Sequence, residues 1–155
     1  MTEAQQRDYD RLYKQMQDFG GKYDQKLIKK AFEYCVLKHD GQKRQTNEDY
    51  YIHPFNVALI IVSLGMDSES IAAALLHDVV EDTKVSKEDI VQQFGAEVAA
   101  LVDGVTKLKT LTYTTSKEEI QAENYRKMFM AMAKDIRVIL IKLADRLHNL
   151  QTLEY

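Results

Sequence analysis

Apolar residues recur along most of the chain at intervals of three and four, the spacing that places them on one face of an α-helix. Glycines, the single proline and N-capping residues divide the chain into segments of this kind. Alternating apolar and polar positions, which would indicate β-strands, are scarce. The predicted helices cover residues 2–19, 24–40, 54–65, 68–83, 86–95, 96–103, 118–133 and 135–153.

This pattern predicts an all-α fold, a compact bundle of about seven or eight helices. At 155 residues the chain has the length of one domain, which we expect to span residues 1–155. The segment 135–153 is apolar almost all round, so we expect it at the centre of the bundle. The threonine-rich segment 108–117 is predicted to be a mobile loop.

One predicted helix carries an unusual concentration of charge. At about 100° per residue, the stretch LLHDVVEDT (residues 75–83) separates His77, Asp78, Glu81 and Asp82 from its leucines and valines. No lysine or arginine lies at the i+4 positions, where it would relieve the repulsion between the acids. The stretch alone is compatible with a solvated acidic face or with a metal or functional site.

Two distant residues could complete a metal site. His53 precedes Pro54 at a predicted helix start, where a cap or a core position is the alternative role. Asp145 lies inside the most apolar helix, and a buried carboxylate needs a cation or an ion-pair partner. Lys142 and Arg146 are the candidate partners if the role is structural.

Polar residues one and two turns beyond Asp145 share its side of the helix. Asn149 lies about 40° and Thr152 about 20° from Asp145 around the helix axis. Polar groups aligned in this way usually face a ligand or a water-filled cleft, so this stripe is a candidate binding surface.

The charge balance limits the kinds of partner that the chain is expected to bind. The chain has 21 basic and 24 acidic residues and a net charge of −3, which argues against a binder of nucleic-acid polymers but permits a small anionic ligand. The N-terminus is polar, without a secretion signal, and the longest apolar run, residues 57–64, is far shorter than the roughly 20 residues that span a bilayer. The single cysteine, Cys35, favours a reducing cytoplasm and a core position.

Longer blocks of sequence surround these residues in a recognisable order. They are GQKRQTNEDYYIHP, AALLHDVVEDT, FGAEVAALVDGVTKL and QAENYRKMFMAMAKDIRVILIKLADRLHNL. From about residue 27 to the end, the chain resembles the hydrolase domain of the RelA/SpoT family, within the HD superfamily of metal-dependent phosphohydrolases. The resemblance implies an HD-domain helical bundle that removes the 3′-pyrophosphate of guanosine tetra- and pentaphosphate, giving GDP or GTP and pyrophosphate.

The resemblance also implies a role for each candidate residue. It implies metal ligands, a carboxylate pair that positions and activates water, and contacts to the guanine nucleotide. The ligands fall on His53, His77, Asp78 and Asp145, the carboxylate pair on Glu81 and Asp82, and the nucleotide contacts on Arg44, Asn149 and Thr152.

Two imidazoles and two carboxylates suit manganese, or iron, better than a structural zinc. No histidine lies between His77 and Asp145, so one ion is expected, and His39 and His148 are interpreted as structural or surface residues. Gln45 replaces a lysine common in the family, which puts one phosphate or base contact in question. The chain ends soon after the last motif, as expected for the N-terminal fragment of a longer hydrolase and synthetase.

Two other functions are compatible with the motifs. One is an HD phosphohydrolase that acts on other nucleotides, such as deoxynucleotides. The other is a regulatory domain that binds the nucleotide without turnover. The Glu81–Asp82 pair and the KLADRLHN block favour the alarmone hydrolase, and the complete ligand set argues against an inactive domain. The oligomeric state is left open.

Overall fold

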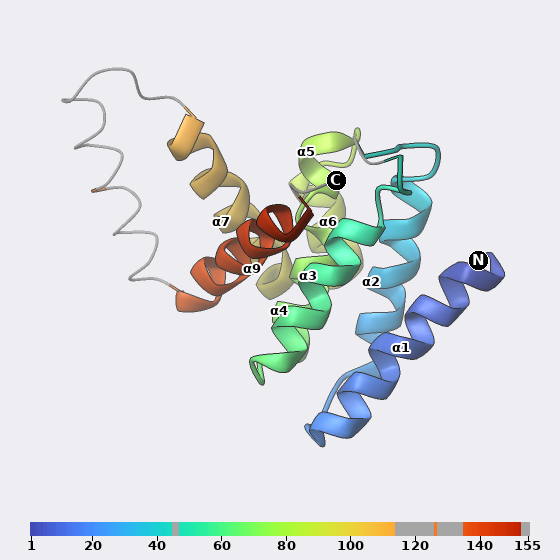
Figure 1. Cartoon of the computed structure of the whole chain (residues 1–155). Helices are drawn as coiled ribbons and strands as arrows, with labels where there is room; N and C mark the ends of the chain where they lie inside the picture. The colour runs from blue at the N-terminus through green and yellow to red at the C-terminus, as the bar shows by residue number, and fades with distance from the viewer. Residues whose placement is uncertain (45–46, 114–125, 127–134, 153–155) are drawn as a thin grey trace.

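In the computed structural model, the described part of the chain comprises residues 1–44, 47–113, 126 and 135–152, and its regular elements are all α-helices (Figure 1). The helices are α1 (Glu3–Phe19), α2 (Gln25–Lys38), α3 (Ile52–Ser63), α4 (Ser68–Leu76), α5 (Val79–Asp82), α6 (Lys87–Phe94), α7 (Ala96–Tyr113) and α9 (Ile136–Thr152). Within these residues the β-structure amounts to one isolated bridge between Lys43 and Asp49. The predicted all-α fold is confirmed.

Helix α4 lies at the centre of the bundle, packed against α2, α3 and α7, while α9 packs on α3 and α7. Every residue from Ser70 to Leu76 is buried. The expectation that segment 135–153 is the central helix was wrong, because Leu143, Leu147 and Leu150 on α9 are 59%, 46% and 62% exposed. The small alanines of α4 let its neighbours approach on all sides, which a count of large apolar residues does not reveal.

The predicted helix ends with local capping signals are confirmed. Thr2 and Gln5 form a reciprocal capping box at α1, with hydrogen bonds of 3.1 and 2.8 Å, and Gly20 ends the helix at a positive φ of 81°. Ser86 and Asp89 form the same motif at α6. These short-range interactions define the helix ends without help from the rest of the fold.

Two predicted helices differ near the functional residues. Helix α3 begins at Ile52, so Pro54 lies inside the first turn, where a missing N–H costs no intrahelical hydrogen bond. The stretch 75–83 is not one helix, since α4 ends at Leu76 and α5 begins at Val79. The His77 ring binds the Ala74 carbonyl oxygen, the acceptor that the next backbone N–H would use in a continuous helix.

Helix α7 continues to Tyr113, beyond its predicted end at Asp103. Gly104 does not break the helix but allows close packing, because a Cβ atom there would lie 2.8 Å from Val138 Cγ2 of α9. The predicted mobile loop 108–117 is therefore helical up to residue 113. The rest of that loop and most of the predicted helix 118–133 lie outside the described residues.

A single arginine joins the start of α9 to two other helices. Arg137 lies 2.8 Å from Asp67 at the start of α4, 2.9 Å from Glu97 of α7 and 2.6 Å from Asp135. These ion pairs fix the end of α9 that is remote from the predicted ligand Asp145. Asp67, Glu69 and Glu97 form a second group of neighbouring acidic side chains. Two of them, Asp67 and Glu97, are paired with Arg137.

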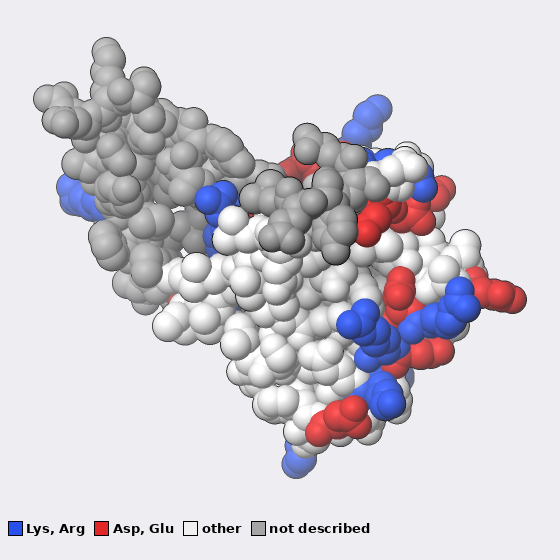
Figure 2. All heavy atoms as spheres, viewed as in Figure 1, with Lys and Arg blue, Asp and Glu red and all other residues white. Residues whose placement is uncertain are grey.

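The surface carries charges of both signs. In Figure 2, basic and acidic side chains lie beside one another over the region occupied by α1 and α2. Among the described residues, no helix combines the length and the apolar character needed to cross a membrane.

Candidate metal and nucleotide site

The structure brings the four predicted metal ligands together from three parts of the chain. His53 lies in the first turn of α3, His77 and Asp78 form the turn between α4 and α5, and Asp145 projects from α9. One donor atom from each lies within 4.8 Å of the other three, and all four residues are buried. We call these four residues the His–Asp cluster.

The donor atoms of the His–Asp cluster converge on one point. Asp145 Oδ1 lies 2.5 Å from His53 Nε2 and 3.2 Å from His77 Nε2. Asp78 Oδ2 lies 3.2 Å from His77 Nε2 and 3.8 Å from His53 Nε2. Two imidazole nitrogens and two carboxylate oxygens therefore surround a common centre from different elements.

Charge is strongly coupled within this cluster. Burial disfavours the charged ring of His77, but the neighbouring carboxylates of Asp78 and Asp145 raise its pKa to about 9. Burial acts on Asp145 in the opposite direction to its histidine hydrogen bonds, which hold the pKa of its carboxyl far below the usual range. The carboxylate of Asp145 thus keeps its negative charge in a buried place and needs a cation there.

Both imidazoles are oriented by a partner of their Nδ1 atom, the ring nitrogen that faces away from the cluster. His77 Nδ1 lies 2.6 Å from the Ala74 carbonyl oxygen, so this nitrogen donates and Nε2 is directed at the carboxylates. His53 Nδ1 lies 2.7 Å from His148 Nδ1. Rings held in this way by a partner on the second nitrogen are characteristic of metal-ligating histidines. The donor set and its orientation fit a divalent cation.

The predicted carboxylate pair lies on the short helix α5, three and four residues after Asp78 of the cluster. Asp82 is exposed and Glu81 partly so, in contrast to the buried ligands. The Tyr50 hydroxyl hydrogen-bonds to the Asp82 carboxylate, and burial, together with this contact and Asp78, raises the pKa of Tyr50. Gln42 Nε2 donates to the Asp82 carbonyl at 3.1 Å. Asp82 is thus held on both its side chain and its backbone.

The three predicted nucleotide contacts also meet. Arg44 Nη2 lies 3.2 Å from Asn149 Oδ1 and 3.3 Å from Thr152 Oγ1, across 105 and 108 residues of sequence. Arg44 Nη1 is buried and has no hydrogen-bond partner among the described residues. We call Arg44, Asn149 and Thr152 the Arg44 group. An unpaired guanidinium nitrogen here is available to an anionic or acceptor group of a ligand.

Two residues with contacts to these groups were not predicted from the sequence. His148 is buried against His53, and burial, with the charges of His53 and Arg44, lowers its pKa to about 4. The available signal was its position three residues after Asp145, which puts it on the same side of the helix. Tyr50, which contacts Asp82, carried no sequence signal because it lies in an irregular loop.

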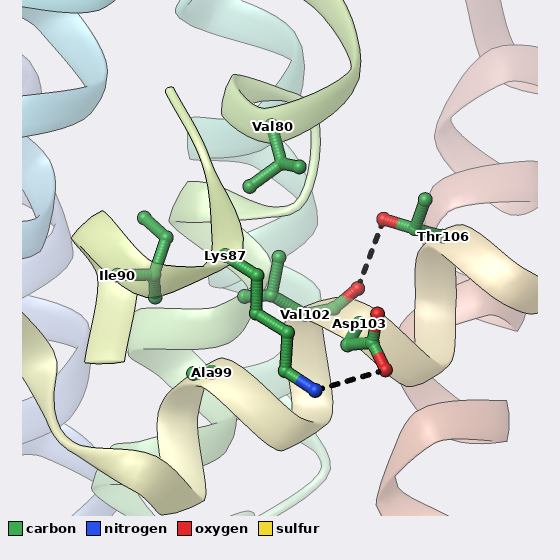
Figure 3. Close-up of a pocket in the computed structure, with 7 residues that line it drawn as sticks. All are labelled: Val80, Lys87, Ile90, Ala99, Val102, Asp103 and Thr106. Atoms are coloured by element: carbon green, nitrogen blue, oxygen red, sulfur yellow. Dashed lines mark hydrogen bonds and ion pairs between the residues drawn. The ribbon is translucent and has the colours of Figure 1, made fainter.

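Figure 3 shows a small hollow between α5, α6 and α7. It is lined by Val80, Lys87, Ile90, Ala99, Val102, Asp103 and Thr106. Its volume of about 20 Å³ is room for about one water molecule. The hollow is therefore a packing feature and too small for a nucleotide.

Comparison with known proteins agrees with this geometry. Residues 31–155 match the family described as "HD domain". The chain belongs to the HD-domain family. Membership in this family and the His–Asp cluster together indicate that the HD domain binds a divalent metal.

Relatives of the HD domain include long bacterial proteins. The chain is 52% identical over 134 residues to a "GTP pyrophosphokinase" of Myxococcus xanthus, and this match covers 85% of the chain and 18% of the relative. It is 54% identical over 126 residues to a "guanosine-3′,5′-bis(diphosphate) 3′-pyrophosphohydrolase" of Aquifex aeolicus, covering 81% of the chain and 18% of the relative. The chain thus spans less than a fifth of these relatives.

A solved structure matches more evenly. It is described as a metazoan ortholog of SpoT that hydrolyses ppGpp, and it superposes with a TM-score of 0.67 at 36% identity. The match covers 86% of this chain and 74% of that chain. The predicted kinship with the RelA/SpoT hydrolases is confirmed by these findings.

Proposed function

We propose that this HD domain hydrolyses guanosine 3′,5′-bis(diphosphate) and the corresponding pentaphosphate at the 3′-pyrophosphate, giving GDP or GTP and pyrophosphate. The observation that carries the proposal is the shared face of α9. Asp145 of the His–Asp cluster and two members of the Arg44 group project from this one helix, so a metal-dependent centre and a binding group adjoin. The relatives named as hydrolases of this nucleotide support the choice of substrate.

We propose manganese as the physiological ion, with iron as the alternative, and one ion per site. Mixed imidazole and carboxylate donors favour these metals, whereas a structural zinc prefers a closed tetrahedral site richer in thiolates. When bound, a divalent ion supplies Lewis-acid stabilisation of the negative charge that develops on the phosphoryl oxygens. The two histidines and two aspartates of the His–Asp cluster would hold it.

The carboxylate pair supplies proton chemistry. A water that attacks phosphorus must lose a proton, and a carboxylate within reach can accept it or orient the water. Glu81 and Asp82 lie on α5, which begins directly after the cluster residue Asp78, and they are more exposed than the ligands, as groups that exchange protons with solvent should be. The Tyr50 and Gln42 contacts hold Asp82 in place without neutralising its charge.

Replacing Arg44 by alanine is expected to lower kcat/KM about 10- to 100-fold, chiefly through a higher KM, because a charge-assisted contact contributes roughly 1.5–3 kcal/mol. Arg44→Lys should restore little, since an ammonium cannot keep the forked contacts to Asn149 and Thr152. Steady-state kinetics with the tetraphosphate checks both variants. Arg146→Ala, at an exposed position on α9, the helix that carries Asn149 and Thr152, is the control for the loss of an arginine. Equal KM values for wild type and Arg44→Ala would remove Arg44 from the binding site.

The products test the proposed reaction directly. Incubation of the tetraphosphate with protein and manganese in ¹⁸O-labelled water is expected to give GDP and intact pyrophosphate, separable by ion-exchange chromatography. Attack on the phosphorus next to the ribose breaks the bond between that phosphorus and O3′, so the label should appear in pyrophosphate. Orthophosphate as the first product, or faster hydrolysis of deoxynucleotides, would point instead to a different HD phosphohydrolase.

The name pyrophosphokinase of the Myxococcus relative describes a protein of which the matched segment is 18%. The site described here contains carboxylates and a metal-binding cluster suited to hydrolysis, so we assign hydrolysis of the nucleotide, and not pyrophosphate transfer, to this segment. A regulatory domain without turnover is the remaining alternative, and the product experiment also separates that case.

We further propose a single domain over residues 1–155, a cytoplasmic location, and a guanine nucleotide rather than a nucleic-acid polymer as the partner.

A further inference from the structure

His148 has an unusual partner for a residue outside the ligand set. Its Nδ1 lies 2.7 Å from Nδ1 of His53, and the two rings are stacked with their centroids 4.9 Å apart and their planes 27° apart. Nitrogens this close share one proton, which one ring donates and the other accepts. The contact joins α9 to α3 across 95 residues of sequence.

The direction of this hydrogen bond decides whether His53 can bind a metal. If His53 donates through Nδ1, its Nε2 keeps a lone pair that points at the centre of the His–Asp cluster. If His148 donates, a neutral His53 carries its hydrogen on Nε2 and cannot be a ligand. Metal binding needs the first arrangement, and at His77 the Ala74 carbonyl oxygen is the acceptor that holds the Nδ1 hydrogen in the same way.

We propose that His148 is a positioning residue, which accepts a hydrogen bond from His53 Nδ1–H and so fixes His53 in the tautomer and orientation that bind the divalent ion. The inference rests on the proposed ligand set. The acceptor that serves His77 is a backbone carbonyl, whereas the one that serves His53 is a side chain, which substitution can remove. One face of α9 thus supplies both a carboxylate ligand and the support for an imidazole ligand.

Two substitutions separate the hydrogen bond from the stacking. His148→Phe keeps an aromatic ring against His53 but has no acceptor. His148→Asn removes the ring but places its Oδ1 near the position of the original Nδ1. Titration of the whole metal-free chain with Mn²⁺ in a calorimeter is expected to show about 10- to 100-fold weaker binding for His148→Phe. The affinity of His148→Asn should stay within about threefold of wild type, because a positioned oxygen accepts as nitrogen does.

A spectroscopic measurement reads the tautomer itself. In the Zn²⁺-loaded, ¹⁵N-labelled protein, long-range ¹⁵N–¹H correlation spectra are expected to show the hydrogen of His53 on Nδ1 in the wild type and in His148→Asn. In His148→Phe the Nδ1 signal should lose its hydrogen-bonded shift. A wild-type His53 with Nδ1 unprotonated in the loaded protein would overturn the proposal.

Controls separate this inference from the proposed function. His53→Ala is expected to lose Mn²⁺ binding, and His39→Phe, at a second buried histidine, is expected to keep it. If His53→Ala binds Mn²⁺ as the wild type does, the ligand set is wrong. If His53→Ala loses the ion while His148→Phe binds it normally, or if both His148 variants lose affinity equally, the ligand set stands and the positioning role of His148 is refuted.

Discussion

Replacement of Asp78 by asparagine is expected to abolish measurable Mn²⁺ binding and to lower hydrolysis of guanosine tetraphosphate on the order of 10³-fold or more. The ligand lost is a buried carboxylate, and the Lewis-acid contribution of a catalytic ion amounts to several kcal/mol. Manganese should raise the melting temperature of the wild type, since it binds only the folded state, and leave that of Asp78→Asn unchanged. Calorimetric titration, melting curves and turnover measure the three effects.

The metal-free variant offers a sharper test than loss of activity. Asp78 lies 3.2 Å from the His77 ring and raises its pKa, so Asp78→Asn removes an ion-pair partner and should itself lower the melting temperature of the metal-free protein. The decisive result is that manganese and chelator no longer change that temperature. Asp103→Asn, at an aspartate of α7 that pairs with Lys87 and Lys107, serves as the control and should keep the response to manganese. A wild type whose melting temperature ignores both manganese and chelator would exclude this metal site.

The double substitution Glu81→Gln and Asp82→Asn is expected to lower turnover about 10²- to 10⁴-fold while leaving the affinities for Mn²⁺ and nucleotide close to wild type. Positioned general acids and bases contribute rate factors of this size. Neither residue belongs to the His–Asp cluster, and neither side chain is part of the core, so the fold should tolerate amides. Single-turnover kinetics and calorimetric titrations of both ligands distinguish chemistry from binding.

Glu88→Gln, an exposed acid on α6, is the matched control for a loss of surface charge. Near wild-type rates in the double variant would show that α5 carries an ordinary solvated acidic face. Loss of Mn²⁺ binding in the same variant would instead make the pair part of the metal site. Either result would reassign Glu81 and Asp82 while leaving the four cluster residues as they are.

The helical fold was predictable because its signals are local. Thr2, Gln5 and Ser86 satisfy backbone groups within three residues of themselves, so their roles can be read from neighbouring sequence. The burial of a whole helix depends on what packs around it. The close packing at the alanines of α4 and at Gly104 depends on pairs of helices. For this reason the sequence did not predict that α4 rather than α9 is the central helix, or that α7 continues past Asp103.

The candidate site was predictable as a set of residues but not as a geometry. Local sequence left two roles open for Asp145, a metal ligand or an ion-pair partner of Lys142. In the structure Lys142 Nζ lies 3.2 Å from Oδ2 while Oδ1 faces His53 and His77, so the ion pair with Lys142 leaves the other oxygen free for the proposed ligand role. Spacing along a helix cannot show this division between the two oxygens.

His148 was interpreted as structural or surface because its sequence neighbours give no reason to treat it otherwise. Its partner His53 lies on another helix, and the meaning of the contact comes from which nitrogen faces which. The orientation of α9 about its axis places His148 against His53 and also places Asn149 and Thr152 against Arg44. These contacts can be recognised only when the relative placement of α3, α9 and the loop before α3 is known.

Residues 145–152 of α9 contact two separate partners, His53 and the Arg44 side chain, from fixed angular positions on one helix. An inserted or deleted residue within this span would rotate everything beyond it by about 100° and shift it by about 1.5 Å. Asp145 would then keep its place while Asn149 and Thr152 turned away from Arg44. Homologous sequences that share the proposed activity should therefore vary freely in length at the Gly20–Gly21 turn, yet show no insertions or deletions between Asp145 and Thr152.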